Sequence, residues 1–147
     1  MSAEPALTCQ ASVDVDLPAS FAWQYMTNVR NWNDPPATFA LEGAFAAGAR
    51  VTTSMPGRPP VYWTIASVDP GRAYTISSVL SDDASIIFQW QFDTLGDDKC
   101  RLTQRLELHG EDAASHVSDV RAAFESNLEP GMRRIAGMMQ AAAERGR

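Results

Sequence analysis

The architecture of this chain follows from residues 113–147, which read AASHVSDVRAAFESNLEPGMRRIAGMMQAAAERGR. Apolar side chains recur there at spacings of three and four residues, which places them on one face of an α-helix. The pattern predicts one long C-terminal helix, and such a helix needs a surface on which its apolar face can lie. The residues of this predicted stripe are Val117, Val120, Phe124, Leu128, Ile135, Met138, Met139 and Ala142.

Local signals describe the ends and the middle of this predicted helix. Asp112 suits the N-cap position, and Arg145 and Arg147 lie at the end where the helix dipole favours positive charge. Pro130 falls inside the helix, and an internal proline removes a backbone hydrogen bond and bends the axis. We expect a bend at Pro130-Gly131 that lets the helix follow a curved sheet; the alternative is a gate over a cavity.

The chain before this helix is mostly short strands in which apolar and polar residues alternate. The first predicted strand spans residues 7–16. Pro18 then begins a helical segment, which bends near Asn28 and stops at residues 31–36, giving a pair of short helices. Turns rich in glycine, proline and aspartate separate the later strands. These strands are predicted at residues 37–43, 49–55, 61–68, 73–80, 84–94 and 100–109.

The order of the predicted elements indicates the fold class. Consecutive strands joined by short turns form an antiparallel meander. Their alternation fits a sheet with one face in water and one face covered by helices. With 147 residues, the chain has the size of one domain. We therefore predict a single α+β domain over residues 1–147.

The composition excludes several classes of protein. The net charge of −6 and the pI near 4.8 argue against a nucleic-acid partner, because phosphate binding needs a basic surface. No apolar run approaches the ~20 residues of a membrane span, and residues 1–5 lack the features of a signal peptide. We expect a cytoplasmic protein without stable membrane insertion. In that compartment Cys9 and Cys100 are expected to be free thiols.

No catalytic or metal-binding motif is recognisable. His109 and His116 fit neither the HExxH nor the HxH pattern. Two cysteines that far apart cannot form a CxxC pair or a four-ligand zinc site. The GxSxG, P-loop and GxGxxG motifs are absent. We therefore predict no metal and no cofactor.

Three polar side chains are embedded in predicted apolar faces. Gln104 shares a strand face with Leu102 and Leu106, so it should point inward. A buried amide needs hydrogen-bond partners, which either a filled cavity or a neighbouring strand would supply. Ser78 lies on an inward face in the same way. Asn127 flanks the helical stripe, where it either reaches a cavity mouth or stays in solvent.

Aromatic side chains crowd three neighbouring predicted strands. Such side chains give a ligand pocket its bulk, but they also fill ordinary cores. In the strand 61–68, the pattern leaves open whether Tyr62 or Trp63 faces inward. Methionines such as Met55 add adaptable surface. The aromatic residues in question are Tyr62, Trp63, Tyr74, Phe88, Trp90 and Phe92.

Several residues carry a resemblance to a known family. They are Pro18, Phe21 and Tyr25 in the first helix, Trp32 at its end, Gly43 and Gly48 around the second turn, Asp69-Pro70, and Gly110. With this element order, the chain resembles the START-like or SRPBCC superfamily, closest to its polyketide cyclase/dehydrase branch. One departure is Ala22, where many members carry an aromatic residue, and this departure would open the cavity wall there.

The resemblance implies a helix-grip fold, in which a seven-stranded curved antiparallel sheet wraps around a long C-terminal helix, with two short helices after strand 1. In such proteins a cavity between sheet and helix receives lipids, polyketides, sterols or other hydrophobic molecules. Members range from carriers to cyclases to chaperone activators, so the fold does not settle the function.

Three hypotheses for function follow. The first is binding of a small hydrophobic ligand in the cavity. The second is a polyketide cyclase/dehydratase-like enzyme, which needs a proton-moving side chain in the cavity. The third is an accessory module that binds another protein. The predicted ligand-binding residues are Met55, Trp63, Tyr74, Ser78, Phe88, Trp90, Gln104, Phe124, Asn127 and Leu128.

Overall fold

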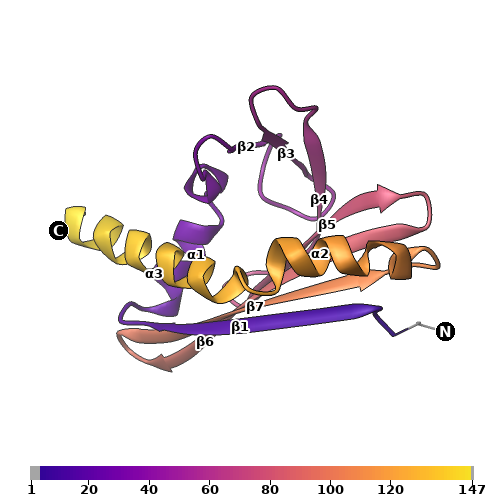
Figure 1. Ribbon diagram of the computed structural model, residues 1–147. Helices are drawn as coiled ribbons and strands as arrows, with labels where there is room; N and C mark the ends of the chain where they lie inside the picture. The colour runs from indigo at the N-terminus through magenta and orange to yellow at the C-terminus, as the bar shows by residue number, and fades with distance from the viewer. Residues whose placement is uncertain (1–3, 147) are drawn as a thin grey trace.

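The computed structural model describes residues 4–146. Residues 1–3 and Arg147 lie outside the described part of the chain. The predictions for the first residues and for Arg147 at the end of the last helix therefore fall outside it as well. Figure 1 shows the helices lying on one side of a single curved sheet. The elements in chain order are β1 (Leu7–Val15), α1 (Ala19–Met26), η1 (Val29–Trp32), β2 (Thr38–Leu41), β3 (Arg50–Ser54), β4 (Val61–Asp69), β5 (Ala73–Ser81), β6 (Ala84–Gly96), β7 (Lys99–His109), η2 (Ala113–His116), α2 (Val117–Phe124) and α3 (Leu128–Arg145).

The sheet has seven antiparallel strands in the order β1-β7-β6-β5-β4-β3-β2. The first strand therefore pairs with the last, with Leu7 opposite Leu108 and Val15 opposite Cys100, while β2 to β7 form a meander. The strands β3 and β4 rise away from β1 and β7 (Figure 1), so the sheet curves around the helical layer. This arrangement confirms the predicted α+β class and helix-grip fold.

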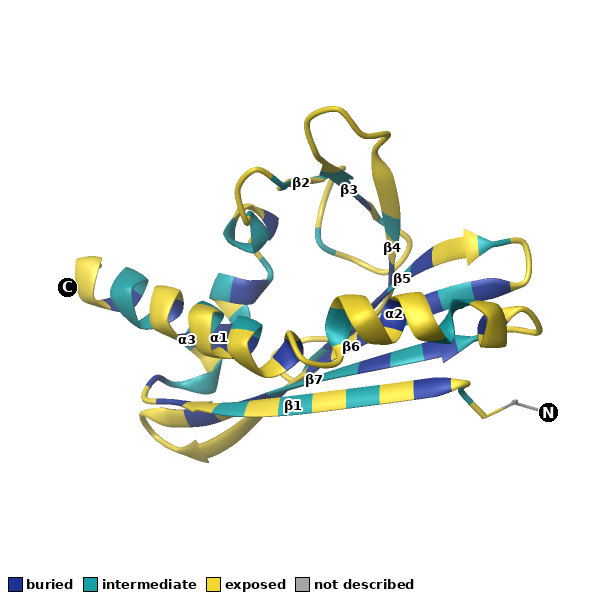
Figure 2. Ribbon diagram, in the orientation of Figure 1, coloured by how far each residue is buried: buried dark blue, intermediate teal, exposed yellow. Residues whose placement is uncertain are grey.

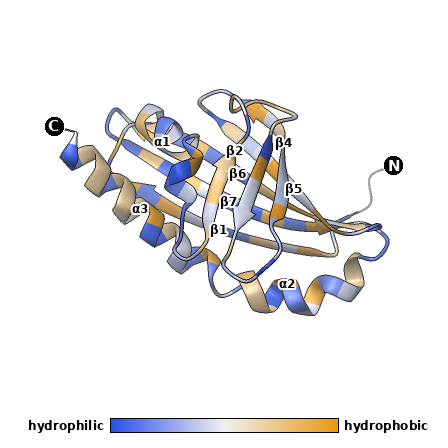
Figure 3. Ribbon diagram, turned by 90° about the horizontal axis from the view of Figure 1, so that it is seen from above, coloured by the Kyte–Doolittle hydropathy of each residue, from blue (hydrophilic) through white to orange (hydrophobic). Residues whose placement is uncertain are grey.

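Alternation of apolar and polar residues decides which face of each strand is covered, as Figure 3 shows along the strands. On β6, the predicted inward residues Phe88, Trp90 and Phe92 are buried. On β4, Trp63 is half-buried and Tyr62 is 53% exposed, which settles the inward side chain of that strand as Trp63. Buried residues, dark blue in Figure 2, alternate with intermediate and exposed ones along the strands.

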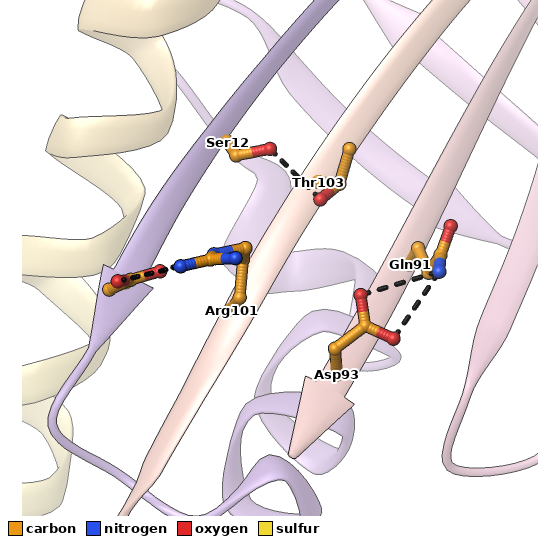
Figure 4. Close-up of polar contacts among 6 residues, drawn as sticks. Ser12, Gln91, Asp93, Arg101 and Thr103 are labelled. Carbon is orange, nitrogen blue, oxygen red and sulfur yellow. Dashed lines mark hydrogen bonds and ion pairs between the residues drawn. The ribbon is translucent and has the colours of Figure 1, made fainter. Parts of the chain in front are cut away.

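The opposite face of the sheet carries polar contacts between strands. Arg101 Nε on β7 donates to Asp14 Oδ1 on β1 at 2.8 Å, and the hydroxyls of Ser12 and Thr103 lie 3.0 Å apart. Figure 4 shows these contacts side by side on the solvent face. Hydrogen bonding from Arg101 lowers the pKa of Asp14. Both side chains of the ion pair stay largely in water, so the pair contributes little stability.

The predicted long C-terminal helix is present as α3, but the prediction that it runs without a break from residue 113 is wrong. The segment divides into η2, α2 and α3, with a break at residues 125–127, visible as the bend between α2 and α3 in Figure 1. Pro130 is the third residue of α3 and therefore lies in its first turn. A proline there lacks only an N–H that would have no helical partner, whereas inside a longer helix its ring would clash with the carbonyl four residues earlier. The predicted bend within a single helix is thus replaced by a full interruption before the proline.

The interruption also changes the face that α3 buries. Met138, predicted to belong to the buried stripe, is 42% exposed. The prediction treated residues 113–147 as one helix with a single periodicity. Because α3 begins anew after the break at residues 125–127, its buried positions differ from those of the predicted stripe. Asp112 takes the N-cap position, as predicted, but of η2, and its side chain makes no capping hydrogen bond. The buried residues of α3 are Leu128, Met132, Ala136, Met139 and Ala143.

Gly110 shapes the corner between β7 and η2. Its φ of +117° is accessible to glycine, and a Cβ added there would lie 2.0 Å from the Asp83 carbonyl oxygen. This close approach lets the Asp112 N–H donate to the same carbonyl at 3.0 Å. The corner thereby ties the start of the helical layer to the β5–β6 turn.

A group of aromatic rings packs around Tyr74 on β5. The ring of Trp32 stacks on it with centroids 5.9 Å apart, and the ring of Trp90 stacks at 6.5 Å. Phe45 approaches edge-on at 5.2 Å. Within residues 4–146, Tyr74 Oη is the one fully enclosed side-chain polar atom without a hydrogen-bond partner. Burial raises the pKa of Tyr74 well above its ordinary value, so the hydroxyl stays protonated.

We expect Tyr74→Phe to keep the fold and to leave the free energy of unfolding unchanged or raised by about 1 kcal/mol. The reason is that the substitution removes a buried hydroxyl whose desolvation no partner offsets. Urea denaturation measures the difference. The matched variant Tyr74→Ala removes the ring as well and should lose about 3–5 kcal/mol. A loss above about 1 kcal/mol in Tyr74→Phe would show that the hydroxyl has a stabilising partner.

A second expectation concerns Glu107 on the outer face of β7. Its carboxylate contacts Arg105 Nε and, at 2.7 Å, His109 Nε2, and hydrogen bonds from these two side chains lower its pKa. A carboxylate whose folded-state pKa is lowered stabilises the fold above its unfolded pKa, and this stabilisation is lost as the pH falls through the folded-state pKa.

We therefore expect Glu107→Gln to lower the free energy of unfolding by roughly 0.5 kcal/mol at pH 7, a small value because water screens the cluster. The difference from the wild type should shrink as the pH falls below about 4.5, the ordinary carboxyl value. Urea denaturation at pH 7 and pH 3 measures both. Glu144→Gln, on the exposed side of α3, is the control. A Glu107→Gln difference that is equal at the two pH values contradicts the expectation.

Candidate ligand-binding cavity

A cavity of about 580 Å³ lies between the covered face of the sheet and the helical layer. The sheet supplies its floor through inward side chains of β4 to β7. Every second residue of these strands points to the covered face, and most of the residues at those positions are apolar. Trp63 packs against Phe88 with ring centroids 5.6 Å apart. The floor residues are Trp63, Ile76, Phe88, Trp90 and Gln104.

The helical wall is built from both sides of the break between α2 and α3. Phe124, the last residue of α2, lines the cavity and meets Phe88 edge-on at 5.2 Å. Leu128, Gly131 and Ile135 continue the wall one and two turns into α3. The interruption before Pro130 therefore lies against the cavity itself.

The segment from η1 to β2 forms the third wall. Trp32 Nε1 donates to the Met26 carbonyl at 2.7 Å, and the ring of Phe39 meets Trp32 edge-on at 5.8 Å. Asn33 Oδ1 accepts from the Phe39 N–H at 2.7 Å. These bonds hold a segment without regular secondary structure against the cavity. The lining residues from this segment are Trp32, Asp34, Ala37 and Phe39, and Met26 at the end of α1 adjoins them in the lining.

Four lining residues are polar or charged. Arg134 Nη2 on α3 donates to Asp34 Oδ2 at 3.2 Å, and this half-exposed ion pair links the helical wall to the η1–β2 segment. Asn127 Nδ2 donates to the Ala123 carbonyl at 2.9 Å. Gln104 makes no side-chain hydrogen bond with any residue that the structure describes. The one carboxylate and the one guanidinium of the lining thus neutralise each other.

Most of the predicted ligand-binding residues come together in this cavity, while three lie elsewhere. Met55 follows β3 and is 38% exposed. Tyr74 lies behind Trp32 and Trp90 and does not reach the cavity. Ser78 is buried, and its Oγ donates to the Tyr62 carbonyl at 2.9 Å. The predicted residues that line the cavity are Trp63, Phe88, Trp90, Gln104, Phe124, Asn127 and Leu128; their role in binding stays a prediction.

The sequence-based reasoning missed the η1–β2 wall and Arg134. Residues 31–37 have the composition of a turn, and an aromatic side chain in a turn carries no periodicity that would assign it a direction. Trp32 was singled out by the resemblance but not as a lining residue. Arg134 follows a second arginine on a helix, a pattern that is typical of a solvated face. Its ion pair with Asp34 joins residues a hundred positions apart, which no local pattern reveals.

A second cluster resembles a hydrolytic triad only in composition. His116 Nε2 lies 3.3 Å from Ser81 Oγ and 3.5 Å from Asp112 Oδ2. In a working triad the two ring nitrogens serve different partners, one the nucleophile and the other the carboxylate. Here one nitrogen faces both, and Ser81 Oγ donates directly to Asp112 Oδ2 at 3.0 Å. The cluster therefore fastens the β5–β6 turn to η2 and does not activate Ser81.

Residues 4–146 contain neither a metal-binding cluster nor a helix able to cross a membrane. No group of three or more His, Cys, Asp or Glu side chains is arranged to hold a metal ion. In the same part of the chain, no helix has both the length and the apolar character needed to cross a membrane. The two cysteines are free.

Comparison with solved structures finds the same fold in proteins of low sequence identity. Norcoclaurine synthase from Thalictrum flavum, in complex with dopamine and hydroxybenzaldehyde, matches with a TM-score of 0.72 and 14% identity over 94% of this chain and 87% of that one. An aromatase/cyclase from a Streptomyces species matches with a TM-score of 0.63 and 16% identity over 91% and 93%. A protein from Arthrobacter aurescens matches with a TM-score of 0.64 and 14% identity over 92% and 85%.

Comparison with curated proteins finds no match. Among protein families, one described as polyketide cyclase / dehydrase and lipid transport matches residues 6–144. This match spans both the sheet and the helical layer that enclose the cavity. The chain therefore belongs to the polyketide cyclase/dehydrase and lipid transport family, and with it to the START-like (SRPBCC) superfamily that its sequence resembles.

Proposed function

We propose that this protein binds a small hydrophobic molecule in the cavity between the sheet and the helices α2 and α3. The observation that carries the proposal is the cavity itself, about 580 Å³ of space walled mainly by aromatic and aliphatic side chains. Ligand pockets in proteins typically enclose about 300–1,000 Å³ and combine an apolar lining with a few polar groups. Both properties are present here.

The kind of lining favours a flat or aromatic ligand. Trp63, Phe88 and Phe124 present rings from two strands and a helix, and aromatic rings prefer stacked or edge-to-face neighbours. The norcoclaurine synthase structure holds dopamine and hydroxybenzaldehyde, both small aromatic compounds. That likeness of fold supports a ligand of similar character for this chain. Free thiols at Cys9 and Cys100 suit a reducing compartment, so we place this binding in the cytoplasm.

The catalytic alternative, a cyclase-like enzyme, has narrower support. It needs a side chain that moves a proton within reach of the substrate. Among the lining residues the one carboxylate is Asp34, and Arg134 occupies it. The hydroxyl of Tyr74 is enclosed behind the wall. These facts favour binding over catalysis.

Gly131 offers a direct test of the cavity. It lines the cavity from the first turn of α3, and a Cβ placed there would meet nothing within 4 Å. We expect Gly131→Leu to fill part of the cavity and to weaken binding of the neutral fluorophore 1-aminoanthracene at least tenfold, measured by fluorescence titration. Because leucine favours helix over glycine by roughly 0.8 kcal/mol, the variant should fold at least as well as the wild type.

Gly137 provides the matched control. It lies on the same helix, on an exposed side away from the cavity, and a Cβ there also meets nothing within 4 Å. Gly137→Leu should gain similar helix stability and bind 1-aminoanthracene as the wild type does. Equal weakening in both variants, or no binding by the wild type, would argue against this cavity as the binding site.

A further inference from the structure

We propose that the ligand is uncharged and carries an oxygen acceptor, such as a ketone carbonyl, that binds to Gln104 and Trp90 on the cavity floor. This inference rests on the proposed function and specifies the class of ligand. It derives from three features of the cavity: the placement of these two side chains, their unused hydrogen-bonding groups, and the charge balance of the wall.

Gln104 and Trp90 are neighbours across two strands. They are directly opposite each other in the register of β6 and β7, and both line the cavity. Side chains of directly opposed residues project from the same sheet face with Cβ atoms about 4.5–5.5 Å apart. One ligand group can therefore reach both.

Neither side chain uses its polar group within the protein. Among residues 4–146, no side-chain hydrogen bond involves the Gln104 amide or the Trp90 indole N–H. The one fully enclosed polar side-chain atom without a partner in that range is Tyr74 Oη, so the amide and the indole nitrogen are not sealed inside the core. By contrast, the indoles of Trp32 and Trp63 donate to Met26 O and Thr53 Oγ1.

The chemistry of the two groups selects an acceptor. An indole N–H only donates, whereas a glutamine amide both donates and accepts. A group that satisfies both must therefore accept from Trp90, and a carbonyl oxygen, with two lone pairs, can accept from Trp90 and from Gln104 at once. A pure hydrocarbon would leave the amide without a partner after water is displaced, which costs free energy.

The wall charges argue against an ionised ligand. Among the described residues, Asp34 and Arg134 are the only charged ones in the lining, and they pair with each other at 3.2 Å. A buried anion or cation would therefore enter without a counter-charge, or would have to break this pair and leave one member unpaired. A neutral polar group meets neither penalty.

A set of three compounds built on one tricyclic ring system tests the inference: 9-fluorenone, fluorene and fluorene-9-carboxylate. Each displaces 1-aminoanthracene from the wild-type protein, and the displacement curves yield their affinities. We expect the ketone to bind about tenfold more tightly than the hydrocarbon, a factor that corresponds to 1.4 kcal/mol. The carboxylate should bind more weakly than the ketone.

Gln104→Leu keeps a side chain of similar size and removes the amide. We expect it to reduce the ketone-to-hydrocarbon affinity ratio to about threefold or less, while fluorene binds as well as in the wild type, which shows that the cavity is intact. Gln89→Leu is the matched control, because Gln89 lies exposed on the same strand as Trp90 but on the outer face. Its ratio should equal that of the wild type.

Three results would overturn the inference: equal binding of ketone and hydrocarbon by the wild type, an unchanged ratio in Gln104→Leu, or a carboxylate that binds more tightly than the ketone. The last result would assign recognition to Arg134. In each of these cases fluorene still binds, so the proposed function stands. If none of the three compounds nor 1-aminoanthracene binds to the folded protein, the proposed function itself fails.

Discussion

The conformational restriction of one proline determines how the helical layer meets the sheet. Pro130 has no N–H to donate, and its ring excludes a helical carbonyl four residues before it, so it is accommodated in the first turn of a helix and not in the middle of one. The chain therefore ends α2 at Phe124 and begins α3 at Leu128. Both of these residues line the cavity. The break between the two helices therefore lies against the cavity.

A curved sheet and an interrupted helix explain why space remains between them. A continuous amphipathic helix would press one unbroken stripe onto the sheet, whereas here the two helices make separate contacts. The wall is completed by small residues, Ala123 and Gly131 among them, opposite large rings on the sheet. On the sheet side, Tyr74 is stacked between Trp32 and Trp90, two of the rings that line the cavity.

The polar groups of the cavity are few, and most of them are already engaged. Asp34 pairs with Arg134, and Asn127, which precedes α3, donates to the Ala123 carbonyl of α2. Among the residues that the structure describes, the side chains of Gln104 and Trp90, which lie opposite each other in the sheet, make no hydrogen bond within the protein. An apolar site of this kind gains affinity from its rings and orientation from a small number of polar contacts. The ion pair links the helical wall to the η1–β2 segment, and under the proposed function the amide of Gln104 is left for the ligand.

Periodicity in the sequence determined the α+β class and the positions of the seven strands within a few residues. It also determined the inward direction of Phe88, Trp90 and Gln104, because the direction of a side chain on a strand depends only on its place in the alternating pattern. The tertiary structure decided the rest. It interrupted the predicted long helix, turned Met138 outward, enclosed Tyr74 and brought Asp34 to Arg134. The enclosure of Tyr74 and the Asp34–Arg134 ion pair depend on contacts between segments distant in the chain, which no local pattern records. The break at residues 125–127 gives α3 a helical phase of its own, so a periodicity fitted to residues 113–147 as one helix assigns Met138 to the wrong face.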